Sequence, residues 1–118
     1  MARLKLTIVL DSGARIGPGK VALLESVRET GSIAAAGRAT GMDYKRAWSL
    51  IDSLNRAFGT PAVERTTGGV GGGGAILTAS GEDLLARYAR LHAAAAELAA
   101  ADLAALESRA SPDPGPKV

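Results

Sequence analysis

Residues 31–58 read GSIAAAGRATGMDYKRAWSLIDSLNRAF, and the expected fold is built around them. Ser32 is a good N-cap for a short, alanine-rich helix that ends near Thr40–Gly41. Asp43 is a good N-cap for a second, longer helix that reaches about Phe58. A short helix, a tight turn with glycine and a longer helix in immediate succession are typical of a helix-turn-helix motif.

The two helices of this motif have the residues needed to pack against each other. The small residues Ala36 and Gly37 let the backbones approach closely, and Ala47 with Leu50 or Ile51 holds the second helix on the first. The predicted buried face of the second helix consists of Ala47, Trp48, Ile51, Leu54 and Phe58. Trp48 is therefore interpreted as a core residue.

The remaining face of the second helix is cationic and rich in hydroxyl groups. A helix fits the DNA major groove, where its first residues meet base edges and their neighbours bind phosphates. The candidate DNA-binding residues of this helix are Tyr44, Lys45, Arg46, Ser49 and Arg56. The alternative is a helix face that simply faces solvent.

A glycine-rich hairpin is predicted after the motif. An extended piece from Ala62 to Thr67 and a second strand from Ala75 to about Leu77 flank the glycine-rich loop 68–74. Such a hairpin is a wing, which approaches the DNA backbone closely because glycines carry no side chains. A nucleotide phosphate loop is disfavoured, because no Lys-Ser/Thr pair follows the glycines and a strand follows in place of a helix.

The elements on either side complete the prediction. Residues 3–10 alternate apolar and polar side chains, as in a half-buried strand, and Asp11–Gly13 supplies a turn. Gly17–Pro18 opens a helix with the apolar face Val21, Leu24 and Val27. The expected fold is mainly α with a small β wing: a winged helix-turn-helix with a long C-terminal helix, forming one domain over residues 1–109.

The long helix at about 79–109 carries a candidate dimerisation surface. Leucines 84, 91 and 98 repeat every seven residues, with one intervening residue of the same face between each pair. The predicted dimer interface comprises Leu84, Tyr88, Leu91, Ala95 and Leu98. Residues 110–118 hold three prolines and are expected to be a disordered tail.

Composition narrows the function classes. The 118 residues contain no cysteine, which excludes disulfides and thiolate zinc sites, and residues 1–76 hold 10 Lys and Arg against 6 Asp and Glu. His92 is the only histidine, and the scattered carboxylates form no catalytic or metal-binding constellation. We expect no enzyme activity, no cofactor, no metal, no signal peptide and no membrane span, and a cytoplasmic location.

Two runs of sequence carry a family resemblance: Gly31-Ser-Ile followed by GMDYKRAW at residues 41–48, and VERTTGGVGGGGAILT at residues 63–78. Together they resemble the N-terminal DNA-binding domain of the ModE molybdate-responsive regulators, over about residues 3–106. A weaker likeness links the same region to the LysR-type winged helix. Such domains are dimers held by the long helix after the wing, and the resemblance implies the same here.

The resemblance also implies roles for individual residues. Ser32 would meet a phosphate, Tyr44, Lys45, Arg46 and Ser49 would face the major groove, and the stretch from Arg65 would contact DNA as the wing. The wing residues so implied are Arg65, Thr66, Thr67, Gly69, Gly71, Gly72 and Gly73. The family's C-terminal molybdate-binding domains are not expected in this sequence, and no oxyanion effector site is assigned.

The function predicted from these observations is a transcriptional regulator that binds a palindromic operator in double-stranded DNA as a homodimer. The alternative is an adaptor that pairs through its long helix with a full-length regulator and binds no operator of its own.

Overall fold

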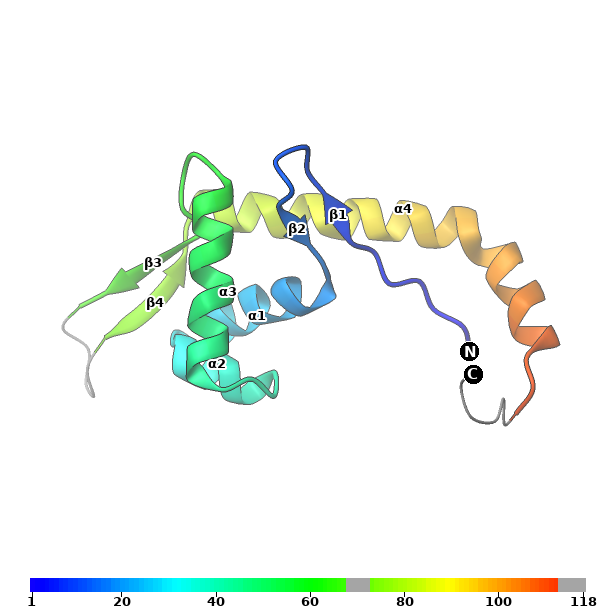
Figure 1. Ribbon diagram of the computed structural model, residues 1–118, viewed down its shortest axis with the longest axis horizontal. Helices are drawn as coiled ribbons and strands as arrows, with labels where there is room; N and C mark the ends of the chain where they lie inside the picture. Colours follow the sequence, from blue (N-terminus) through cyan, green and yellow to red (C-terminus); the bar gives the residue numbers. More distant parts are fainter. Residues whose placement is uncertain (68–72, 113–118) are drawn as a thin grey trace.

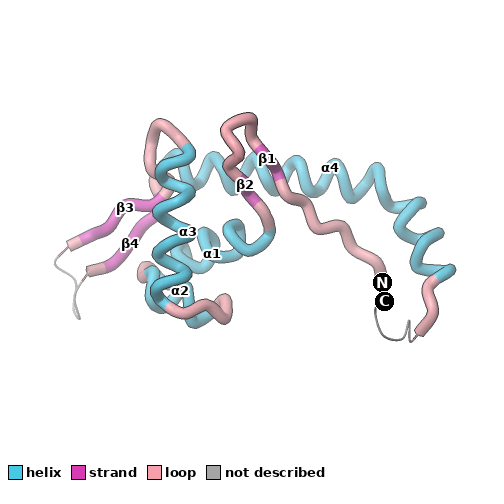
Figure 2. The backbone as a smooth tube through the Cα atoms, viewed as in Figure 1, coloured by secondary structure: helices cyan, strands magenta, loops and turns pink. Residues whose placement is uncertain are grey.

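The computed structural model describes residues 1–67 and 73–112 of the chain. Its elements, in chain order, are β1 (Ile8–Val9), β2 (Arg15–Ile16), α1 (Pro18–Thr30), α2 (Ile33–Ala39), α3 (Tyr44–Ala57), β3 (Val63–Thr66), β4 (Gly74–Leu77) and α4 (Ala79–Arg109) (Figures 1 and 2). The described strands form two separate antiparallel pairs, β1 with β2 and β3 with β4. This confirms the predicted fold, mainly α with a small β wing.

Both helices of the helix-turn-helix begin at the predicted caps. The Ser32 hydroxyl accepts a hydrogen bond from the Ala35 N–H at 3.1 Å, and the Asp43 carboxylate accepts one from the Arg46 N–H at 2.7 Å. Each cap satisfies one of the backbone donors that a helix leaves without a partner in its first turn. Local sequence therefore determines where α2 and α3 start.

The turn between α2 and α3 depends on two glycines. Gly41 has φ +74°, a left-handed conformation that side chains disfavour. A Cβ on Gly37 would lie 3.2 Å from both the Ala47 Cβ and the Met42 carbonyl oxygen. Absence of a side chain at Gly37 thus allows the close approach of α2 and α3 that the sequence predicted.

The core is formed by α1, α2, α3, the β3–β4 hairpin and the first turns of α4. Leu24 and Val27 of α1 are fully buried, and Ile51 and Leu54 of α3 are nearly so. The predicted apolar face of α1 is confirmed. Burial of each large aliphatic side chain stabilises the fold by about 1.5–3 kcal/mol.

The β3–β4 hairpin is fixed to the helices at several points. Its strands pair in the register Val63 with Leu77 through Thr66 with Gly74. The Ala75 N–H donates to the Gly31 carbonyl oxygen at 2.9 Å, which holds β4 against the end of α1. At the base of the hairpin, a Cβ on Gly81 would overlap the Ala62 carbonyl oxygen, so only glycine fits at this position of α4.

The N-terminal strand is much shorter than predicted. Residues 3–10 show the expected alternation of half-buried and exposed side chains, but only Ile8–Val9 form a strand, paired with Arg15–Ile16. The carbonyls of Leu4 and Leu6 are instead bonded to side chains of α4. A strand can be no longer than the partner strand that it bonds. The alternation of apolar and polar side chains in residues 3–10 does not show how long that partner is.

Helix α4 is longer than the rest of the fold can cover. Figure 1 shows it extending past α1 and α3, with the N-terminal segment alongside. Over residues 1–112 without the gap at 68–72, no helix is long and apolar enough to cross a membrane. The predicted disordered tail lies, from residue 113 on, outside the described residues.

Candidate nucleic-acid interface

The first turns of α3 present an exposed cationic surface. Tyr44, Lys45, Arg46 and Ser49 are all exposed. In the described part of the chain, the Lys45 and Arg46 side chains form no hydrogen bond or ion pair. Two cationic side chains with no partner inside the fold remain available to a polyanion.

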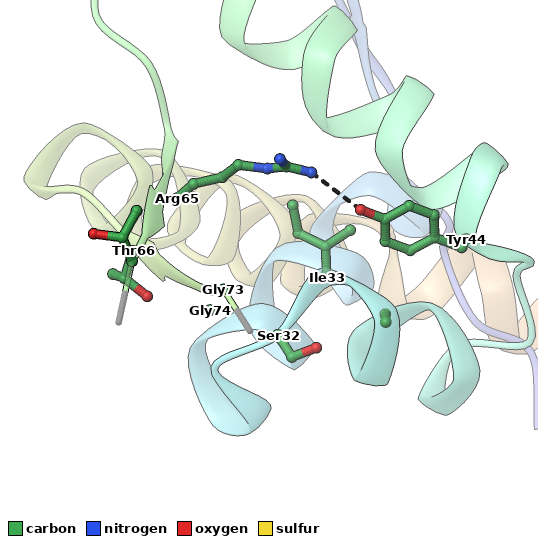
Figure 3. A pocket seen from close by; sticks show the side chains of 9 residues that line it. Ser32, Ile33, Tyr44, Arg65, Thr66, Gly73 and Gly74 are labelled. Carbon is green, nitrogen blue, oxygen red and sulfur yellow. Dashed lines mark hydrogen bonds between the residues drawn. The ribbon is translucent and has the colours of Figure 1, made fainter. Parts of the chain in front are cut away.

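A hollow of about 330 Å³ lies next to this surface, where α2, α3 and the hairpin meet. Ser32 reaches it from the start of α2, Tyr44 from the start of α3, and Arg65 from β3 (Figure 3). Thr66, Thr67 and Gly73 line it from the hairpin. Tertiary structure therefore brings together predicted DNA-binding residues from three elements.

Ser32 is the N-cap of α2 and also lines the hollow. Its hydroxyl oxygen accepts the bond from the Ala35 N–H that caps α2. An accepting hydroxyl keeps its own O–H as a donor. Ser32 can therefore cap the helix and still donate to a phosphate oxygen.

Arg65 and Tyr44 are bonded to each other. The Arg65 guanidinium donates to the Tyr44 Oη at 3.0 Å (Figure 3), and its Cζ lies 4.4 Å from the centre of the Trp48 ring. Trp48 is only partly buried, and one face of its ring carries this cation. The prediction of Trp48 as a simple core residue was therefore incomplete, since the ring joins the core to the surface.

Asn55 is a positioning residue that the sequence analysis missed. Its side-chain oxygen accepts from the Ala62 N–H at 2.9 Å and the Val63 N–H at 3.2 Å, and its nitrogen donates to the Val63 carbonyl at 3.0 Å. The available signal was an amide four residues after Ile51, on the apolar face of the helix. A polar side chain on such a face requires partners.

The other predicted DNA-binding residues do not line the hollow, or lie outside the described residues. Arg56 lies in the last turn of α3, outside the hollow, and forms an exposed ion pair of 3.2 Å with Asp52. Gly69, Gly71 and Gly72 lie outside the described residues.

The predicted dimer residues divide into inner and outer ones. Tyr88 is buried, and its hydroxyl donates to the Leu6 carbonyl within the same chain at 2.5 Å. Leu84 and Ala95 are half-buried, whereas the exposed fractions of Leu91 and Leu98 are 51% and 86%. The exposed part of the predicted interface is therefore Leu91 and Leu98.

The histidine of α4 is used inside the chain. His92, the single histidine, lies with its Nε2 2.8 Å from the Leu4 carbonyl oxygen and its ring stacked near Tyr88. Among residues 1–67 and 73–112, no cluster of three or more His, Asp or Glu side chains is arranged to hold a metal ion. His92 fastens the N-terminal segment to α4.

Comparison with known proteins agrees with this geometry. The family described as "Bacterial regulatory helix-turn-helix protein, lysR family" matches residues 19–82, more than half of the chain. The chain is 45% identical to the molybdenum-pterin-binding protein MopB of Rhodobacter capsulatus, over 77% of this chain and 34% of MopB.

Two ModE regulators show the same kind of partial match. Identity is 41% with the transcriptional regulator ModE of Yersinia pestis and 38% with the dual regulator ModE of Escherichia coli K12, each over 74% of this chain and 33% of the relative. The chain thus spans about a third of the length of these curated relatives. These matches confirm the resemblance to ModE-type regulators expected from the sequence.

Proposed function

Because the chain belongs to the lysR family of bacterial regulatory helix-turn-helix proteins, we propose that it is a ModE-type transcriptional regulator that binds double-stranded DNA. The observation that carries the proposal is the exposed pair Lys45 and Arg46 on the first turns of α3, beside the hollow lined by Ser32 and Arg65. Helix α3 enters the major groove, and Lys45 and Arg46 donate to guanine edges or phosphates.

The hollow fits the DNA backbone that flanks this groove. Its lining offers the hydroxyl groups of Ser32, Tyr44 and Thr66, which can donate hydrogen bonds to phosphate oxygens. A phosphate seated there would fix the register of α3 in the groove. Strands β3 and β4 of the hairpin then lie beside the adjacent backbone.

The proposed active form is a homodimer joined through α4. Leu91 and Leu98 expose large apolar surfaces at a seven-residue spacing, and a second copy of the helix would cover them. Two recognition helices related by two-fold symmetry bind half-sites about 34 Å apart in a palindromic operator. We expect the protein to act in the cytoplasm, where its DNA is.

Selection of genomic DNA fragments by the purified chain tests this function. We expect enrichment of palindromic fragments, bound with nanomolar affinity that falls steeply with salt. Parallel selections with and without molybdate test whether the oxyanion changes binding. Recovery of random fragments only would contradict operator recognition, and would favour an adaptor that pairs through α4 with a full-length regulator.

A further inference from the structure

The cluster formed by Tyr44, Trp48 and Arg65 joins helix α3 to strand β3 of the hairpin. Tyr44 and Trp48 lie four residues apart, on one face of α3. Arg65 comes from β3, so its stacking on Trp48 and its hydrogen bond to Tyr44 tie the hairpin to the recognition helix. We call these three residues the aromatic clamp.

A second tie lies further along the same helix. Asn55, seven residues after Trp48, holds the backbone of Ala62 and Val63. Seven residues of α-helix rise about 10 Å. Strand β3 is therefore attached to α3 at two points about two turns apart, and two points determine an angle where one point would allow a pivot.

The opposite strand is held by another element. Ala75 is the partner of Arg65 across the hairpin, and its N–H donates to the Gly31 carbonyl at the end of α1. At the level of this residue pair, the hairpin is therefore held by α1 on one side and by the aromatic clamp on the other. Loss of the clamp would leave β3 attached to α3 only at the base of the hairpin.

We propose that Trp48 and Arg65 are positioning residues for DNA recognition, which set the angle of the wing against α3 through the aromatic clamp. The proposal rests on the proposed function and gives Arg65 a role other than a phosphate ligand. Because Tyr44 accepts the Arg65 hydrogen bond, its own O–H remains a donor and is polarised for a DNA phosphate. The clamp thus orients both the hairpin and one of the groups that faces DNA.

The first test uses the protein without DNA. Trp48 is the only tryptophan, so its emission reports the clamp directly. Arg65→Gln should shift this emission, whereas the control Arg90→Gln on α4 should not. In a double-mutant cycle of urea unfolding, Trp48→Leu and Arg65→Gln should couple by about two- to fivefold in the folding equilibrium constant. Independent effects would show that the clamp does not form in solution and would overturn the proposal.

The second test measures binding to a labelled duplex recovered by genomic selection. Trp48→Leu and Arg65→Gln should each weaken binding by about two- to fivefold, and the double variant should bind no more weakly than the weaker single variant. Trp48→Phe, which keeps an aromatic face, should restore most of the affinity.

Salt dependence separates a positioning role from a phosphate contact. The slope of log K against log salt is negative, and loss of one phosphate contact makes it less steep by about 0.9. We expect Arg65→Gln to leave the slope unchanged. A less steep slope would overturn the positioning role, and so would a double variant whose loss of affinity is the product of the two single losses. A wild-type chain that binds no fragment would contradict the proposed function instead, and the DNA-free cycle would still decide whether the clamp exists.

Discussion

Two side chains of α4 hold the N-terminal segment by its backbone. Tyr88 donates its hydroxyl to the Leu6 carbonyl, and the His92 ring bonds the Leu4 carbonyl one helical turn later. Burial raises the pKa of the Tyr88 hydroxyl, because charge is disfavoured away from water. Tyr88 and His92 thus bond the backbone of residues 4–6, as the partner strand β2 bonds the backbone of Ile8–Val9.

The Tyr88 hydroxyl should make stability dependent on alkaline pH. A raised folded-state pKa means that the neutral form is favoured in the folded protein, so its stabilisation is complete below about pH 10 and is lost as pH rises through the folded-state pKa. At pH 7, Tyr88→Phe should lower the free energy of unfolding by about 0.5–1.5 kcal/mol. Urea titrations of both proteins from pH 7 to pH 11 should show this difference shrinking, and a constant difference would contradict the prediction.

The exposed cations Lys45 and Arg46 of α3 should contribute directly to DNA affinity. Lys45→Ala and Arg46→Ala should each weaken operator binding by about 1–3 kcal/mol if the side chain contacts a base. Fluorescence anisotropy with a labelled operator measures this loss. Arg90→Ala, which removes an exposed cation from α4, is the matched control and should bind as the wild type does. Unchanged affinity in both α3 variants would exclude α3 as the recognition helix.

At the scale of elements, α3 has three different surfaces. Ala47, Ile51 and Leu54 are buried against the core, Tyr44, Trp48 and Asn55 hold the hairpin, and Lys45 and Arg46 face solvent. A single helix can carry all three because 3.6 residues per turn distribute its side chains around the axis. The proposed recognition surface, Lys45 and Arg46, is therefore oriented by the two surfaces that anchor α3.

Helix α4 should determine the oligomeric state. Placing a carboxylate at an exposed apolar contact opposes burial of that position against a second copy. Leu91→Glu with Leu98→Glu should convert a dimer to a monomer in sedimentation velocity, while helix content by circular dichroism stays the same. Glu97→Gln, an exposed change between the two leucines, is the control. A double variant that remains dimeric would place the interface elsewhere.

At the scale of the whole molecule, the chain is extended. Its radius of gyration is 17.2 Å, against about 13.5 Å for a compact domain of this length. The excess comes from α4, which projects beyond the helix-turn-helix in Figure 1. Leu91 and Leu98, the proposed dimer interface, lie on this projecting helix, away from the proposed recognition surface on α3.

A dimer with fixed geometry should depend on operator spacing. Insertion of about 5 base pairs between the half-sites turns one major groove to the opposite side of the duplex, so both recognition helices cannot bind together. We expect at least tenfold weaker binding in gel-shift titrations. A scrambled sequence of the original spacer length should bind normally if the spacer is not contacted. Equal affinity for both spacings would indicate that the subunits bind independently.

Much of the fold could be predicted from interactions between residues close together in the sequence. Ser32 and Asp43 predicted the starts of α2 and α3 because a cap needs only residues three positions away. The short hairpin also followed from the glycine-rich loop between two short extended segments. The truncated strand at Ile8–Val9 did not, since its length depends on β2 and on Tyr88 of the distant α4.

The helix-turn-helix, its caps, the hairpin and the cationic residues of α3 could all be predicted from local sequence, because they depend on backbone preferences and on spacing within one element. Three contacts emerged only from the packed fold: Arg65 stacks on Trp48, Asn55 holds the base of the hairpin, and Tyr88 bonds the backbone of Leu6. Each of these contacts joins two different elements, and their geometry exists only after the elements have packed against a common core.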